Sequence, residues 1–305
     1  MRTAFIRTLE QEAAADESIC LIVGDLGFGV VTEFAKRFPR QFLNAGVAEQ
    51  NMTGIAAGMA MSGRTVFTYS IANFPTIRPY EQIRNDICYH NANVKIVAVG
   101  GGFCYGALGV THFATEDLAV MRALPNMVVV APGDPWEAAA ATQALVKHNG
   151  PAYLRLGRAG EPAVHQHPVD FIIGKAIPVR PGNDVALLAI GGVVHNAVKA
   201  ADVLELEGIH ARVISMGTLK PLDEEAVLSA ARETGAILTV EEHSIIGGLG
   251  GAVAEILCES SLDVRFRRLG VPSEFPSRVG DQEWFLRQYG LDIDGIARSV
   301  RRLLA

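Results

Sequence analysis

One carboxylate, Glu49, stands near the start of a run of small and apolar residues that extends from Asn44 to Ala60. Gly54, Gly58 and neighbouring alanines would let another helix approach closely, and a helix of this composition is buried on most sides. A buried carboxylate needs a partner or a raised pKa, so Glu49 is a candidate for proton chemistry. The alternative is that Glu49 only accepts hydrogen bonds from the free N–H groups that begin the helix.

Two loops that follow predicted strands carry further candidate residues. The segment Tyr69–Gln82 groups aromatic and apolar side chains where open α/β sheets bind ligands, although these side chains could equally pack beneath the loop. The loop Gly100–His112 is rich in glycine but matches neither the dinucleotide-binding nor the P-loop pattern. Long loops of this kind are usually functional or mobile, whereas His112 could be purely structural.

Two charged segments complete the set of candidates. Arg155 and Arg158 lie at the end of a predicted strand, where they could clamp a phosphate or carboxylate or could be ordinary surface charges. The segment Glu241–Gly250 joins a strand to a helix through a glycine turn. It could bind an anion at the helix start or serve packing alone.

These candidates require a framework of alternating strands and helices. Apolar runs without strict alternation predict parallel strands that are covered on both faces, at Ile19–Val23, Thr65–Tyr69, Val94–Val99, Met127–Ala131, Val185–Ile190, Ala211–Ser215, Ala236–Glu241 and Val264–Leu269. Helices are expected between them, at Met52–Met61, Pro79–His90, Thr115–Ala123, Pro135–His148, Val194–Glu207, Glu224–Thr234 and Gly250–Glu259. Asp134 is expected to cap the helix that begins at Pro135. The fold class is therefore α/β, with two doubly wound domains at residues 1–165 and 183–305 and a proline-containing linker at 166–182.

The composition limits the kinds of partner. The chain of 305 residues has a formal net charge of −6, which argues against nucleic acid and against an anionic membrane surface. No apolar run is long enough to span a bilayer, and the first residues contain no signal-peptide core. Four widely spaced cysteines without a CxxC pair favour reduced thiols and a cytoplasmic location, with no visible metal motif.

Five segments, taken in order, resemble the C-terminal half of transketolase-like enzymes that use thiamine diphosphate. They are AGVAEQN at 45–51, EQIRN at 81–85, GVTH at 109–112, MRALPNM at 121–127, and EEH with GGLG at 241–250. The resemblance covers essentially the whole chain. It implies a pyrimidine-binding domain followed by the transketolase C-terminal domain.

The resemblance also implies roles for cofactor-binding residues. Glu49 would hydrogen-bond N1′ of the aminopyrimidine ring, and a protonated carboxyl there favours the imino form of the cofactor that removes the thiazolium proton. The remaining matches to the family's cofactor pocket are Asp25, Leu26, Tyr69, Ile71 and Phe74. Ile71 replaces a phenylalanine that usually stacks, which implies weaker stacking.

Further matches fall on the substrate site. His112 corresponds to the family histidine that contacts the donor carbonyl, and Arg2 and Arg158 to the arginines that hold a sugar phosphate. Residues Val99–Gly109 stand where two-gene transketolases read THAGITVGEDG. We therefore place Gly100, Phe103 and Leu108 at the substrate as well.

That stretch also departs from the family pattern. The family's histidine is replaced by Gly100, and its acidic pair by Ala107 and Leu108. A leucine cannot make the hydrogen bond to a donor hydroxyl, a loss of about 1–3 kcal/mol. The change predicts an atypical donor, either a modified sugar or a short 2-oxo acid.

Half of the cofactor site is missing from the sequence. The family binds Mg²⁺ and the diphosphate through a GDG motif followed by NN, and neither motif occurs here, since Gly24 and Asp25 are followed by Leu26. The resemblance therefore implies a second chain that carries GDG…NN, holds Mg²⁺ and the diphosphate, and forms an α2β2 assembly with this one. No metal ligand is expected on this chain.

Three readings of the function follow. The first is a subunit that transfers a two-carbon ketol or acyl unit to an aldehyde or sugar acceptor. The second is an E1 β-like subunit of a 2-oxo acid dehydrogenase, or a relative of deoxyxylulose phosphate synthase. The third is a non-catalytic partner subunit with a decayed donor pocket, against which the presence of Glu49 and His112 argues.

Overall fold

The computed structural model describes all residues, 1–305, and contains two sheets. The first sheet has seven strands in the order β10-β5-β6-β4-β3-β1-β2. In chain order they are β1 (Ile19–Val23), β2 (Phe42–Asn44), β3 (Thr65–Ile71), β4 (Val94–Val99), β5 (Val128–Val130), β6 (Ala152–Leu156) and β10 (Thr218–Lys220). All pairs are parallel except β10 with β5. The central strands are buried along their whole length, which explains their continuous apolar runs.

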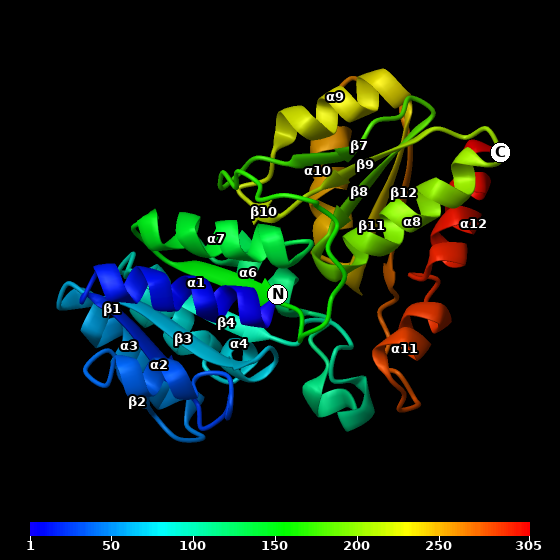
Figure 1. Ribbon diagram of the computed structural model, residues 1–305. Helices are drawn as coiled ribbons and strands as arrows, with labels where there is room; N and C mark the ends of the chain where they lie inside the picture. The colour runs from blue at the N-terminus through cyan, green and yellow to red at the C-terminus, as the bar shows by residue number, and fades with distance from the viewer.

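Helices cover both faces of this sheet. Helices α1 (Arg2–Ala15), α2 (Thr32–Arg37) and α7 (Pro135–Lys147) pack on one face, where α1 and α7 lie side by side (Figure 1). Helices α3 (Glu49–Met61), α4 (Phe74–Ile77), α5 (Tyr80–Gln82) and α6 (Asp117–Ala123), with the π-helix η1 (Ile83–Cys88), belong to the other side. The predicted helix Pro79–His90 is present as one continuous helical run that changes from α to π geometry at Ile83. Short 3₁₀ turns occur at Gly106–Leu108, Val110–His112 and Gly191–Val193.

The second sheet has five strands in the order β12-β11-β8-β9-β7. They are β7 (Ile177–Arg180), β8 (Val185–Ile190), β9 (Ala211–Ser215), β11 (Ala236–Ser244) and β12 (Arg265–Val271). Helices α8 (Val194–Glu205) and α12 (Ile293–Leu304) pack on one face, with α11 (Gln282–Gln288) beyond them, and α9 (Glu224–Thr234) and α10 (Leu249–Glu259) lie on the opposite side (Figure 1). Both sheets with helices on two faces confirm the predicted α/β class.

Strand β7 lies within the range 166–182 that the sequence predicted to be a linker. It pairs antiparallel with β9 at the edge of the second sheet. Pro178, one of the prolines that suggested a linker, sits inside this strand. An edge position tolerates proline because one side of the strand has no neighbour that needs its N–H.

The chain has two units, each formed by one sheet and the helices that cover it, and the two units share elements. Strand β10 follows β9 in the chain but joins the first sheet, where Thr218 pairs with Val130. A hydrophobic cluster of 35 buried residues contains side chains from both units. Residues that follow the strands of the first sheet can therefore meet residues from the second unit. None of the helices combines the length and apolar character needed to cross a membrane.

Candidate active site

Glu49 is buried and its carboxylate is paired. It is the first residue of α3, its side chain is 4% exposed, and both carboxylate oxygens accept hydrogen bonds from Nη1 of Arg78 at 3.0 and 3.1 Å. Burial was predicted and is confirmed. The carboxylate bonds to Arg78 rather than to helix N–H groups, so the alternative of simple helix capping does not describe it. Arg78 itself is 47% exposed, which leaves one side of the pair open.

Arg78 links Glu49 to two other predicted site residues. Its guanidinium carbon lies 4.0 Å from the ring centroid of Phe74, and that ring meets His112 edge-on with 5.1 Å between centroids. Asn73 donates a hydrogen bond to the carbonyl of Thr111 at 3.1 Å, which ties the two loops together. Glu49, Arg78, Phe74 and His112 therefore form a continuous series of contacts, called the open row below.

A cavity of about 490 Å³ opens beside Glu49. The residues around it belong to the start of α3 and the segment before it, together with Arg78: Val47, Ala48, Glu49, Gln50, Asn51 and Arg78. Val47 is 71% exposed, an unusual state for a large apolar side chain next to a buried carboxylate. The Glu49 carboxylate is thus placed at the side of a space that a ligand ring could enter.

The sheet explains why these residues meet. Strands β1, β2, β3, β4 and β6 are all parallel, so their carboxyl ends lie at one edge of the sheet. The predicted residues Asp25, Glu49, Phe74, His112 and Arg158 all come after one of these strands. This is the edge at which open α/β sheets bind ligands.

Three of the predicted cofactor residues adopt defined positions near this edge. Asp25 has a positive φ of 53° and exchanges hydrogen bonds with Asn44 at 3.0 Å through both its backbone N–H and its carboxylate. Leu26 and Ile71 are half-buried. The loops after β1 and β2 are therefore joined immediately beside α3.

Tyr69 does not offer a surface to a ligand. It is 1% exposed and its ring stacks on Phe5 of α1 with 6.2 Å between centroids. Burial also raises the pKa of its hydroxyl. Its side chain belongs to the face of the sheet opposite to α3. We therefore assign Tyr69 a supporting role beneath the loops in place of the expected direct contact with the cofactor.

The predicted substrate residues divide into two groups. Leu108 and Arg158 are exposed, Arg2 is half-buried with an Nε atom that has no hydrogen-bond partner, and Gly100 is buried with a φ of +87°. Phe103 is 0% exposed and stacks on Phe285 at 4.3 Å in the core of the second unit. Its side chain cannot reach a substrate, and the expectation for Phe103 is corrected accordingly.

A larger cavity of about 820 Å³ lies between the two units. Its lining includes the predicted residues Leu108 and Arg158, with Tyr105 beside them. Side chains of the second unit, among them His195 and Gln282, complete the wall. The cavity is therefore built by both units and reaches Leu108 and Arg158, whereas Arg2, Gly100 and His112 do not line it.

Arg155 belongs to a closed cluster rather than to this cavity's open side. Its Nε donates to Asp117 at 2.8 Å, and its Nη2 donates to the carbonyls of Ala114 and Glu242 at 2.9 Å each. Arg155 is 5% exposed and Asp117 is 1% exposed. Of the two candidate arginines, only Arg158 remains free to meet a ligand.

The segment Glu241–Gly250 completes this cluster. The carboxylate of Glu241 accepts hydrogen bonds from the N–H groups of Leu249 and Gly250 at 2.7 and 2.8 Å, so the anion at the start of α10 is the chain's own glutamate. Glu242 accepts from the Phe103 N–H at 2.7 Å and from Gln282. Packing, one of the two alternatives for this segment, is therefore its role within the chain.

Burial sets the ionisation of the cluster. It raises the pKa of Glu241 and of Glu242 to about 7 and lowers the pKa of His243 to about 4. The bonds of His243 agree with a neutral ring. Nε2 accepts from the Ala119 N–H at 3.3 Å, which leaves the proton on Nδ1, 2.7 Å from the Ser244 carbonyl oxygen.

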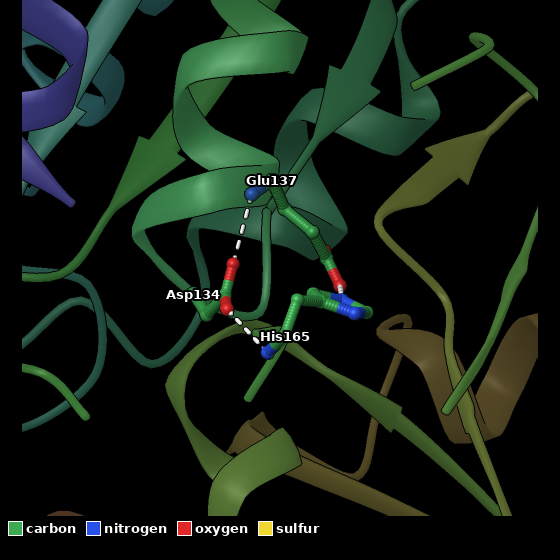
Figure 2. Close-up of side chains that lie close together, drawn as sticks. All are labelled: Asp134, Glu137 and His165. Carbon is green, nitrogen blue, oxygen red and sulfur yellow. Dashed lines mark hydrogen bonds and ion pairs between the residues drawn. The ribbon is translucent and has the colours of Figure 1, made fainter. Parts of the chain in front are cut away.

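Asp134, Glu137 and His165 are close enough to hold a metal ion but already satisfy one another (Figure 2). Asp134 caps α7 by accepting from the Glu137 N–H at 2.8 Å, as predicted, and its second oxygen accepts from the N–H groups of Val164 and His165. The Glu137 oxygens accept from His165, Gly133 and Ser215. Every carboxylate oxygen has a donor, so we assign no metal to this cluster.

Sequence reasoning missed Arg78 and Tyr105. Arg78 lies in the loop after β3, and Glu49 follows β2; these strands flank β1 in the sheet. A single arginine in one loop and a single buried glutamate in the other could have suggested the pair. Tyr105 could have been noticed as a bulky aromatic residue in a loop that holds mostly small residues.

Comparisons with known proteins agree with this architecture. Residues 1–161 match the family model of the transketolase pyrimidine-binding domain, and residues 174–296 that of the transketolase C-terminal domain. The chain is 41% identical over 301 residues to a subunit of the apulose-4-phosphate transketolase of Phocaeicola vulgatus, covering 98% of this chain and 96% of that one. It is 37% identical over 304 residues to a 6-deoxy-6-sulfo-D-fructose transketolase subunit of a Clostridium species, with 99% and 94% covered.

A solved structure has the same fold throughout. A split-gene transketolase, described as an inactive β4 tetramer, superimposes with a TM-score of 0.90 at 40% identity and covers 99% of this chain and 97% of that one. The family models and the full-length relatives lead to one conclusion. The chain belongs to the transketolase family, as a counterpart of the C-terminal-half subunit of split transketolases.

Proposed function

We propose that this chain is one subunit of a thiamine diphosphate-dependent enzyme that transfers a two-carbon ketol or acyl unit to an aldehyde or sugar acceptor, and that it works only with a partner subunit. The observation that carries the proposal is the buried Glu49 carboxylate beside an open cavity, with a half-exposed Arg78 as its ion-pair partner. The pair therefore has a side that a ligand can reach.

The residues at this edge fit the aminopyrimidine half of the cofactor. Glu49 would hydrogen-bond a ring nitrogen, and the half-exposed ring of Phe74 together with Leu26 would hold flat apolar groups. When bound, thiamine diphosphate supplies the carbon nucleophile and electron sink for cleaving the bond next to a ketone. Glu49 would hold the proton that it shares with the pyrimidine ring nitrogen.

His112 and the arginines would act on the donor. His112 would donate a hydrogen bond to the donor carbonyl oxygen, where negative charge develops. Arg158, and Arg2 with its unpartnered Nε, would bind an anionic group at the far end of the donor. Gly100 and Leu108 would leave the middle of the donor without the family's usual polar contacts.

The missing diphosphate site supports a partner subunit with the GDG…NN motif, which would hold Mg²⁺ in an α2β2 assembly. Three large apolar residues are exposed after β1, β2 and β3, at the same edge as Glu49, namely Phe28 (80%), Val47 (71%) and Ile77 (49%). Such residues favour a protein interface. A similar subunit that forms an inactive β4 tetramer is consistent with this dependence.

The named relatives support an unusual donor. One acts on apulose 4-phosphate and another on a sulfonated fructose, to judge from their names. We infer that this chain also accepts a modified sugar rather than an ordinary ketose phosphate.

The four cysteines are unpaired, which supports a reducing, cytoplasmic setting.

The test is co-expression with a partner that carries GDG…NN, followed by a transfer assay with ketose phosphates and 2-oxo acids. We expect Glu49→Gln to lower turnover by roughly 10²- to 10⁴-fold, the usual contribution of proton-transfer groups. Glu81→Gln, a change at an exposed glutamate, is the matched control. Unchanged turnover in Glu49→Gln would overturn the proposal, and transketolase-like rates with xylulose 5-phosphate would overturn the unusual donor alone.

A further inference from the structure

Gly100 and Tyr105 fit together as a pair. A Cβ atom added at Gly100 would lie 2.1 Å from Cε2 and 2.3 Å from Cδ2 of the Tyr105 ring. Gly100 also has a φ of +87°, a conformation that other residues rarely adopt. The tyrosine ring therefore occupies the space into which a side chain at position 100 would project.

The resemblance to two-gene transketolases gives this fit a meaning. The stretch THAGITVGEDG, placed on Val99–Gly109, has histidine at position 100 and valine at position 105. Here the large side chain has moved from the first position to the second. The two exchanges depend on each other, since the histidine and the tyrosine ring cannot occupy the same space.

Tyr105 stands between two residues of the proposed donor site. Its ring centroid lies 6.4 Å from that of His112 and 5.6 Å from the guanidinium carbon of Arg158. The ring lines the cavity of about 820 Å³ together with Leu108 and Arg158, and it is only half-buried. The ring therefore lies near both the expected carbonyl contact and the expected anion contact, and part of it is exposed to the cavity.

We propose that Tyr105 is a specificity-determining residue of this donor site, an inference that rests on the proposed function. In place of an imidazole at 100 and a carboxylate at 108, the middle of the site presents an aromatic ring and a leucine side chain. These groups leave donor hydroxyls without partners and favour C–H surface. Among modified ketose phosphates, the preferred donors are those with few hydroxyl groups next to the transferred unit, and the ring face also holds the Arg158 guanidinium in place.

The experiment compares two donors in the two-subunit complex: xylulose 5-phosphate, and erythrulose 4-phosphate, which has one hydroxylated carbon fewer. We expect the double variant Gly100→His/Tyr105→Val to shift the ratio of their kcat/KM values at least about fivefold toward xylulose 5-phosphate, as regaining one hydrogen bond would. Tyr105→Phe should keep the wild-type ratio because it preserves the ring. Tyr89→Val, at a tyrosine that is 80% exposed, is the matched control.

A ratio of two kcat/KM values does not depend on the fraction of folded enzyme, so partial misfolding of the double variant does not obscure the result. A ratio within twofold of wild type overturns the role of Tyr105 while the proposed function stands. If the wild-type complex transfers from no donor and Glu49→Gln changes nothing, both proposals fail.

Discussion

The molecule contains two groups of glutamate or aspartate, arginine and histidine that differ in their surroundings. In the closed cluster between the two units, formed by Asp117, Arg155, Glu242 and His243, every side chain is at most 5% exposed. In the open row, Arg78 is 47% exposed although Glu49 is buried. The closed cluster bonds to itself and to neighbouring groups and joins the units, although Asp117 Oδ1 has no hydrogen-bond partner. The open row retains a free side, which is what binding requires.

The largest expected effect lies in the closed cluster. Asp117→Ala would leave the Arg155 guanidinium buried without its carboxylate, and we expect a loss of about 3–5 kcal/mol in the free energy of unfolding. Urea denaturation of the free subunit measures it. Glu207→Ala, which removes an exposed partner of Arg301, should change little. A small loss in Asp117→Ala would mean that the buried Arg155 guanidinium does not depend on this carboxylate.

The second-largest effect is a pH dependence of the free energy of unfolding, which arises from Glu242 in the same cluster. Burial raises the pKa of Glu242 from its ordinary 4.5 to about 7, so the folded state binds more protons than the unfolded state between those values. The contribution of Glu242 is fully present below pH 4.5 and is lost as pH rises to 7. Relative to Glu242→Gln, wild type should lose up to about 3 kcal/mol over this range.

Urea titrations of both proteins at several pH values between 4.5 and 7.5 check this difference. The neutral His243, whose pKa is lowered to about 4, works in the opposite direction as pH falls, but it is present in both proteins and cancels. Glu259→Gln, at an exposed residue, should follow wild type in parallel. Parallel curves for Glu242→Gln would show that Glu242 is not held in its neutral form.

The smallest effect is expected in the open row. Arg78→Ala removes an ion pair and a contact with the Phe74 ring. Because Arg78 is half-exposed and borders open space, water can reach the Glu49 carboxylate once the arginine is gone, and we expect a change of at most about 1 kcal/mol in the stability of the free subunit. The same urea titration measures it. If Arg78→Ala lowered the free energy of unfolding as much as Asp117→Ala, the open row would be a structural cluster. It would then not differ from the closed cluster.

Local patterns were sufficient for much of the framework. The strands Ile19–Val23, Val94–Val99, Val185–Ile190 and Ala211–Ser215 have the predicted bounds, because a strand that is buried on both faces must be apolar throughout. Asp134 was recognisable as a helix cap for a similar reason, since its partner is only three residues away. Helices α1, α2, α4, α11 and α12 were missed, although α1 buries Phe5, Ile6, Leu9 and Ala13 at helical spacing.

Other features depended on contacts that no local pattern encodes. Strand β10 has three residues and pairs with β5, far away in the chain. The assignment of Phe103 to the substrate failed because its ring packs on Phe285 from α11. The resemblance to the family placed Tyr69 in the cofactor pocket, yet the alternation of β3 turns its ring towards α1.

The sequence by itself determined the α/β class, the parallel strands and the burial of Glu49, since these follow from the spacing of apolar and small residues along the chain. Only the tertiary structure decided which charged residues are closed and which are open. Arg155 and Arg158 stand three residues apart, yet Arg155 bonds to Asp117 and to the Glu242 carbonyl while Arg158 lies over the Tyr105 ring. The partners that separate their environments come from distant parts of the chain, and the space at Gly100 is likewise set by how the loop folds back on itself.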